Sequence, residues 1–197
     1  DIADITVIPV SGLTTTEAAT TATFTVVLDA KPTANVVIPI SSGNTAEVAV
    51  SPANLTFTTG NWNVDQTVTL TGVDDAGVID GDRLVTIALA VPSGSADTNF
   101  NVIDPADVTV TNTDGNLAGY TVTPTNGLIT SESGTQNTFT VVLDAKPTAD
   151  VIFDVNSGTP LEVSVSPATL TFDTNNWNTP QTVTLTGEDD GSNDGEQ

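Results

Sequence analysis

Apolar and polar residues alternate along most of this chain with the two-residue period of a β-strand. In the segment 23–28, Phe24, Val26 and Leu28 fall on one side, and Thr23 and Thr25 fall on the other. The same alternation recurs in four later segments, 36–40, 66–71, 83–91 and 106–111. Apolar residues on one side and Thr on the other predict two packed sheets, each with one solvated face.

Turn residues separate these segments, and no stretch has a helical period. Pairs such as Ser11-Gly12, Ser42-Gly43 and Ser51-Pro52 mark the turns. Thr and Val, which favour strands, dominate the segments between them. About seven strands are expected in the first half of the chain, a number that fits an immunoglobulin-like sandwich. The predicted fold class is therefore all-β, with tandem immunoglobulin-like sandwiches.

The chain repeats itself without a gap. Residues 6–75 match residues 121–190 at a constant offset of 115, with roughly two thirds of the positions identical. We expect a complete repeat over residues 1–115 and a second over residues 116–197. The second has no sequence that matches the last two strands of the first, Arg83–Val91 and Ala106–Thr111. Either the second repeat is cut short, or a neighbouring chain donates the strands that complete it.

The charge of the chain restricts its partners. There are 25 acidic and 3 basic residues, which gives a formal net charge of −22. Such a surface repels nucleic acid and anionic membranes and attracts cations. No apolar run approaches the length of about 20 residues that crosses a bilayer. We therefore expect neither nucleic-acid binding nor membrane insertion.

The chain has no Cys, Met or His, so disulfides and the usual zinc and copper ligands are absent. Carboxylate oxygens remain, and these suit Ca²⁺ or Mg²⁺. No side chain of suitable pKa is available to activate a Ser or Thr nucleophile, and we expect neither enzymatic activity nor catalytic residues. No organic cofactor site is expected.

The informative acidic residues fall in loops between the predicted strands. In a sandwich, the first connection, the loop before strand six and the end of strand seven can meet at one end. Carboxylates gathered there repel one another unless a divalent cation lies among them. The residues concerned are Glu17, Glu47, Asp74, Asp75, Asp80, Asp82 and Asp114 in the first repeat, and Glu132, Glu162, Asp189, Asp190, Asp194 and Glu196 in the second.

Three motifs resemble the Calx-β domain, known from sodium–calcium exchangers and large bacterial surface proteins. They are Val73-Asp74-Asp75 with Asp80-Gly81-Asp82, then Leu84-Val85-Thr86-Ile87, then Val110-Thr111-Asn112-Thr113-Asp114. The resemblance implies that the acidic residues of the first repeat bind calcium at one tip of the domain. The role of Glu47 rests on this match alone. The shorter acidic runs here imply fewer or weaker ions than in the exchanger domains.

Near-identical adjacent repeats favour a mechanical role, because binding modules usually diverge in their loops. The expected function is a calcium-binding structural module that rigidifies an adhesin or surface filament, at the bacterial cell surface or elsewhere outside the cell. Its partners would be calcium and neighbouring repeats, in the same chain or in other copies in a fibre. A carbohydrate- or protein-binding module is the alternative. Trp62 and Trp177, each between two Asn residues, suit a cap on the sandwich end better than a sugar-stacking platform.

Overall fold

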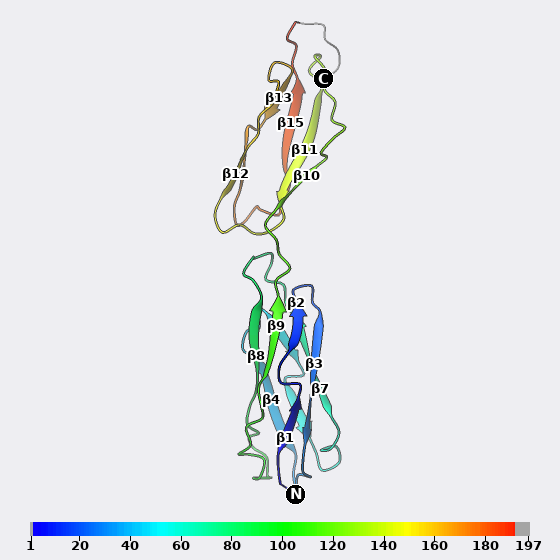
Figure 1. Ribbon diagram of the computed structural model, residues 1–197, viewed down its shortest axis with the longest axis vertical. Helices are drawn as coiled ribbons and strands as arrows, with labels where there is room; N and C mark the ends of the chain where they lie inside the picture. The colour runs from blue at the N-terminus through cyan, green and yellow to red at the C-terminus, as the bar shows by residue number, and fades with distance from the viewer. Residues whose placement is uncertain (1, 192–197) are drawn as a thin grey trace. The chain divides into compact units, whose positions relative to one another are not determined.

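The computed structural model is all-β and describes residues 2–191 (Figure 1). Contacts divide the described residues into two compact units. Unit 1 comprises residues 2–75 and 80–115, and unit 2 comprises residues 76–79 and 116–191. Within these residues no helix has the length and apolar character that a membrane crossing requires.

Unit 1 is a sandwich of two sheets (Figure 1). The first sheet has the order β1 (Ile5–Ile8), β3 (Thr21–Leu28), β7 (Gln66–Gly72) and β5 (Val48–Ser51). The second has the order β2 (Leu13–Thr16), β9 (Val108–Thr113), β8 (Arg83–Leu89), β4 (Val36–Ser42) and β6 (Asn54–Phe57). All neighbouring strands are antiparallel except β2, which runs parallel to β9. The predicted sandwich class is confirmed.

Unit 1 has nine strands where the sequence predicts about seven, because two extended segments are each divided between the sheets. The first segment gives β1 to one sheet and β2 to the other, and it breaks at Pro9. The second gives β5 and β6 in the same way, and it breaks at Pro52. Proline has no N–H to continue a ladder of hydrogen bonds, which explains why the chain changes sheet at these two points.

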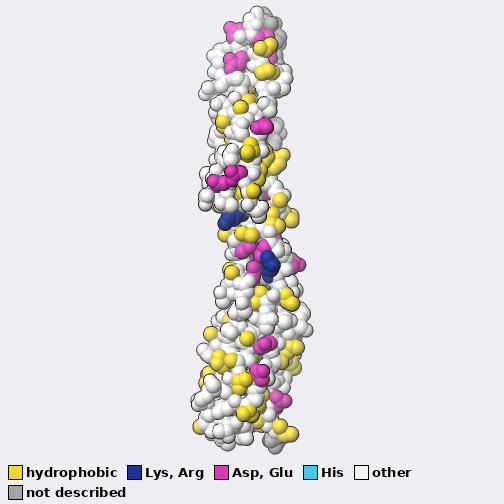
Figure 2. Space-filling model, turned by 90° about the vertical axis from the view of Figure 1, so that its left-hand side faces the viewer, with side chains coloured by type: hydrophobic (Ala, Val, Ile, Leu, Met, Phe, Trp, Pro, Cys, Tyr) yellow, Lys and Arg dark blue, Asp and Glu magenta, His cyan; other side chains and the backbone are white. Residues whose placement is uncertain are grey.

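The core of unit 1 lies between the sheets and follows the predicted alternation. Phe24, Ile38, Phe57 and Leu70 are each at most 1% exposed. Trp62 packs against the edge of this core, as Trp177 does in unit 2, and this supports the interpretation of both as caps. On the face drawn in Figure 2, most of the surface belongs neither to charged nor to apolar side chains, as outward-facing Thr predicts.

Unit 2 has a complete first sheet and a reduced second one. The first sheet has the order β10 (Tyr120–Thr123), β11 (Gln136–Leu143), β15 (Gln181–Gly187) and β13 (Val163–Ser166). The second contains β12 (Val151–Asp154) and β14 (Thr169–Phe172). Within the described residues nothing corresponds to β8 or β9. Residues 128–131, which match β2, form no strand. A strand that pairs only with β9 in unit 1 therefore does not form where β9 has no counterpart.

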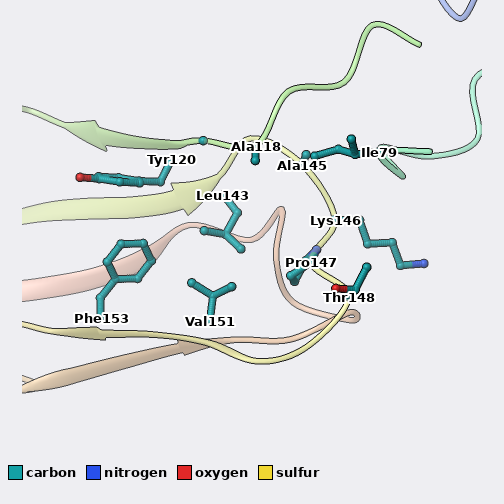
Figure 3. Close-up of a pocket in the computed structure, with 11 residues that line it drawn as sticks. Ile79, Ala118, Tyr120, Leu143, Ala145, Lys146, Pro147, Thr148, Val151 and Phe153 are labelled. Carbon is teal, nitrogen blue, oxygen red and sulfur yellow. The ribbon is translucent and has the colours of Figure 1, made fainter. Parts of the chain in front are cut away.

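The core of unit 2 is correspondingly less buried. Leu170, Phe172 and Val183 are as buried as their counterparts in unit 1. Phe139 and Leu185 are partly exposed, whereas the matching residues of unit 1 are at most 1% exposed. Figure 3 shows apolar side chains of β10, β12 and the end of β11 around an open space in this unit.

Gly72, the last residue of β7, lies against β2 and β9 of the other sheet of unit 1. A Cβ atom there would overlap the carbonyl oxygen of Thr16 and lie 2.6 Å from Asn112 Oδ1. The backbone oxygen belongs to β2 and cannot move without shifting that strand. In unit 2, a Cβ atom at Gly187 would overlap the carbonyl oxygen of Ser131 in the same way. Glycine at this position is therefore required by space.

We predict that Gly72→Ala lowers the free energy of unfolding of unit 1 by about 1–3 kcal/mol, the usual cost of overpacking. Gly60→Ala is the matched control, because its Cβ atom would lie 3.8 Å from the only atom nearby; we expect a change within about 0.5 kcal/mol. Urea unfolding followed by Trp62 fluorescence in a Trp177→Phe background measures both. Equal effects of the two substitutions would contradict the packing argument.

Candidate metal centre

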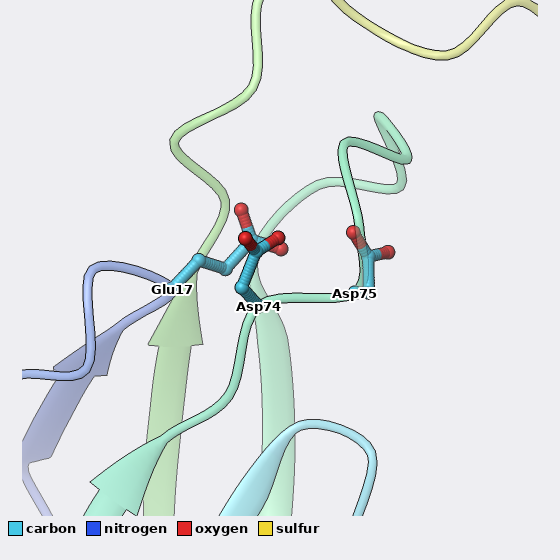
Figure 4. Close-up of side chains that lie close together, drawn as sticks. All are labelled: Glu17, Asp74 and Asp75. Carbon is cyan, nitrogen blue, oxygen red and sulfur yellow. The ribbon is translucent and has the colours of Figure 1, made fainter. Parts of the chain in front are cut away.

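Five of the seven acidic residues predicted in unit 1 gather at one end of its sandwich. Glu17 follows β2, Asp74 and Asp75 follow β7, Glu47 precedes β5, and Asp80 lies in the loop before β8. They form two triads, Glu17–Asp74–Asp75 and Glu47–Asp75–Asp80. In each triad, one oxygen of every carboxylate lies within 4.8 Å of the others. Figure 4 shows the side chains of Glu17 and Asp74 close together, with Asp75 further along the same loop.

Asp82 and Asp114 belong to the same end but to neither triad. Asp114 Oδ2 accepts hydrogen bonds from the backbone N–H groups of Asp80, at 3.1 Å, and Gly81, at 2.8 Å. Asp82 Oδ1 accepts one from the backbone N–H of Asp114, at 3.2 Å. These two carboxylates hold the loop before β8 against the end of β9. The hydrogen bonds of Asp114 end on the backbone of Asp80 and its neighbour Gly81.

Asn112 organises the buried side of the site, although the sequence analysis assigned it no role. It is 1% exposed, and its Nδ2 donates to Glu47 Oε2, at 3.2 Å, and to the carbonyl of Val73, at 3.3 Å. Its Oδ1 accepts from the hydroxyl of Thr15, at 3.0 Å. The available signal was the alternation of β9, which turns this Asn inward in line with Val108 and Val110.

Arg83 is the second residue that the sequence analysis left out of the site. Its Nε donates to Asp80 Oδ2 at 2.7 Å, the one ion pair found among residues 2–191. Asp80 Oδ1 is buried and has no hydrogen-bond partner. A buried carboxylate oxygen with no donor is costly unless a cation approaches it. Arg83 thus neutralises one face of Asp80, and the other oxygen is available to a ligand.

Burial raises the pKa of Glu17 above 4.5, and the nearby negative charges of Asp114, Asp75 and Asp74 raise it further. The hydrogen bond from the backbone N–H of Gly115, at 3.0 Å, acts in the opposite direction but is outweighed. Glu17 is 9% exposed, so water screens these charges poorly. Burial and the neighbouring carboxylates thus both disfavour the charged form of Glu17.

This arrangement fits a hard divalent cation. Every candidate ligand is a carboxylate oxygen, and five such groups from three loops converge. Calcium takes about 6–8 oxygen ligands in flexible geometry, and backbone carbonyls and water can complete such a set. A cation would satisfy Asp80 Oδ1 and offset the repulsion between the carboxylates. The predicted Ca²⁺ ligands Glu17, Glu47, Asp74, Asp75 and Asp80 are thus the ones that the structure brings together.

The acidic residues of unit 2 are not gathered to the same extent. Glu132 and Glu162 are partly exposed, and Asp189 and Asp190 are exposed. Up to Gly191, no three carboxylates of unit 2 approach as closely as those in unit 1. Asp194 and Glu196 lie outside the described residues. Calcium binding by unit 2 stays a prediction.

Neither a protein-family model nor a curated protein sequence matches the chain. Several solved structures resemble it. The apo form of the Calx CBD1 domain is 21% identical with a TM-score of 0.43, and covers 59% of this chain and 100% of that one. CBD12 from CALX1.2 is 15% identical with a TM-score of 0.44, and covers 94% of this chain and 76% of that one. The E. coli chaperone DraB is 9% identical with a TM-score of 0.41, and covers 95% and 88%. At these low identities and TM-scores, the likenesses carry no conclusion about what this chain binds.

We predict that Glu17→Gln stabilises calcium-free unit 1 at neutral pH. The pKa of Glu17 is higher in the folded than in the unfolded protein, so folding takes up a proton between the folded value and 4.5. Stability from this group therefore rises as the pH falls through that window. In chelator, the unfolding midpoints of the wild type and of Glu17→Gln should differ at neutral pH. The two midpoints should converge as the pH falls to 4.5. A difference that does not depend on pH would contradict this assignment.

Proposed function

We propose that unit 1 is a calcium-binding module and that Asp75 is its central ligand. The observation that supports this most directly is the place of Asp75 in both carboxylate triads. One cation beside Glu17, Asp74 and Asp75 and a second beside Glu47, Asp75 and Asp80 would account for every carboxylate in the cluster. Asp82 and Asp114 would act through the backbone, by holding the loop that carries Asp80.

Calcium suits these loops better than magnesium. Magnesium demands near-ideal octahedral geometry and keeps several of its waters, whereas calcium accepts irregular sets of 6–8 oxygens. The ligands proposed here come from separate loops around the end of a sandwich, and nothing in their spacing imposes an octahedron. Carboxylates whose oxygens lie within 4.8 Å repel one another, although water weakens this repulsion at the exposed Asp74. A divalent cation would convert that repulsion into attraction.

We propose further that the module is a structural repeat of a protein outside the cell, such as an adhesin or surface filament. The sequence supports this in two ways. Adjacent repeats of nearly the same sequence are typical of arrays with one mechanical task. The calcium sites of extracellular modules have dissociation constants of about 0.1–1 mM, and a partly exposed site can reach this affinity. By fixing the acidic loops, the ion would stiffen this end of the module.

We predict that millimolar calcium raises the melting temperature of unit 1 and that Asp75→Asn removes most of the rise. At a Kd of about 0.1–1 mM, calcium at about 5 mM stabilises the folded state by about 1–2.3 kcal/mol. Without calcium, Asp75→Asn should unfold at a higher temperature than the wild type, because it relieves repulsion. This reversal separates a lost ligand from a damaged fold. Calorimetry in chelator, calcium and magnesium measures all three states.

The matched control for this experiment is Asp65→Asn. Asp65 is exposed and belongs to neither triad, yet its substitution removes the same charge. It should leave the calcium-dependent rise intact. Equal losses in the two variants would mean that calcium acts on the net charge of the protein and not at this site. No calcium-dependent rise in the wild type would overturn the proposal.

A further inference from the structure

The neutral side chain of Asn112 lies on the inner side of the acidic end of unit 1. Its carboxamide is buried, and the two ends of the amide meet groups of opposite kind. Nδ2 donates to Glu47 Oε2 at 3.2 Å and to the carbonyl of Val73 at 3.3 Å. Oδ1 accepts from the hydroxyl of Thr15 at 3.0 Å. Only one orientation of the amide satisfies all three partners.

An ionised aspartate at position 112 could not replace this amide. Both of its oxygens accept hydrogen bonds, so it would face Glu47 Oε2 and the carbonyl of Val73 without a donor. Buried acceptors that lose their donor cost free energy, and a second buried charge beside Glu47 would add repulsion. All the residues of the two triads are acidic, whereas the residue that holds Glu47 from the inside has to donate.

The contacts of Asn112 join two segments that carry candidate ligands. Glu47 lies just before β5, and Val73 directly precedes Asp74 and Asp75. The backbone N–H of Val73 donates to the carbonyl of Glu47 at 2.8 Å. Asn112 binds the side chain of Glu47 and the carbonyl of Val73, and so makes a second link between the same two residues. Glu47 is thereby tied to the segment that carries Asp75, which belongs to both triads.

The hydrogen bond from Asn112 also divides the two oxygens of Glu47 between two tasks. Oε2 accepts from Asn112, which leaves Oε1 as the oxygen available to an ion. Glu47 is 6% exposed, and a carboxylate held in this way keeps its place beside Asp75 and Asp80 before any ion arrives. Groups that orient a metal ligand from behind commonly contribute 10–100-fold, in order of magnitude, to the affinity for the metal.

Glu17, the buried carboxylate of the other triad, is held by different groups. Its carboxylate accepts the backbone N–H of Gly115 at 3.0 Å, and its own N–H donates to the carbonyl of Thr113 at 3.3 Å. Both partners are backbone groups of residues that follow Asn112. A substitution of the Asn112 side chain therefore leaves these groups of the chain in place.

We infer that Asn112 is a positioning residue for one of the two ions, the one that Glu47, Asp75 and Asp80 would bind. Asn112 presents Glu47 to this ion and so determines the affinity of this triad. The triad of Glu17 does not depend on it. The inference rests on the proposed calcium site, but the two can fail separately.

Each triad can be measured alone in the full chain. Asp74→Asn disables the triad of Glu17, and Asp80→Asn disables the triad of Glu47, because Asp74 and Asp80 each belong to only one triad. Calcium titrations followed by the NMR shifts of the backbone amides of unit 1 give the affinity in each background. Asp75→Asn, which removes a ligand of both triads, measures the response to calcium that comes from outside the site.

Asn112→Leu removes the donor and keeps a side chain of similar size. In the Asp74→Asn background it should weaken calcium binding by at least about tenfold, because Glu47 loses the group that holds it. In the Asp80→Asn background the same substitution should leave the affinity nearly unchanged. A role in folding alone would not produce this difference between the two backgrounds.

The matched control is Val110→Ala. Val110 precedes Asn112 on the same inward side of β9 and is fully buried in the core. Its truncation destabilises unit 1 by leaving a cavity, but it leaves the hydrogen bond between Asn112 and Glu47 in place. It should have little effect on the calcium affinity in either background.

A loss of affinity that is the same in both backgrounds, or no loss in either, would overturn the inference and leave the proposed calcium site standing. No response of unit 1 to calcium in the wild type would overturn both. If Asn112→Leu does not fold, Asn112→Ser takes its place. The hydroxyl of Ser ends one atom short of the position of Nδ2 and does not reach Glu47 Oε2, so the same loss in the Asp74→Asn background is expected.

Discussion

Pairing of β9 with β2 on one side and β8 on the other holds the second sheet of unit 1 together, and both the core and the acidic site depend on it. The parallel pairing with β2 brings Thr15 beside Asn112, and Asn112 in turn reaches Glu47. It also places the end of β9 next to Glu17, whose carboxylate accepts the N–H of Gly115. The same strand thus joins the apolar interior to the polar end of the sandwich.

Unit 2 shows the arrangement that a similar sequence adopts without this pairing. All four strands of its first sheet form, with the register of unit 1, because none of them pairs with a counterpart of β8 or β9. The segment that matches β2 stays outside any strand, and Glu132 and Glu162 become more exposed than Glu17 and Glu47. Glu132, Asp189 and Asp190 match the first triad of unit 1, but within the described residues they form no such triad. Strand pairing at the end of β9 is one feature that unit 1 has and the described part of unit 2 lacks.

Much of the fold could be predicted from local pattern, and less of the site could. The alternation of Phe24, Val26 and Leu28 gave the strand and its buried face, because a two-residue period leaves little freedom. The division of the first strand at Pro9 was not foreseen, since the sequence does not show which sheet each half joins. The loop carboxylates were recognisable as a set. Which of them converge depends on side-chain contacts such as Asn112–Glu47 and Arg83–Asp80. The spacing of residues along the chain does not specify these contacts.

The sharing of Asp75 between two triads has a consequence for how such a site would respond to its ion. Two cations that use one carboxylate cannot bind independently. The first cation would order the loop that binds the second, but it would also neutralise part of the negative charge that attracts the second. Whichever effect is larger, linkage requires each ion to change the affinity of the other by the same factor. The steepness of the calcium response, and not only its midpoint, would then be determined by a single side chain.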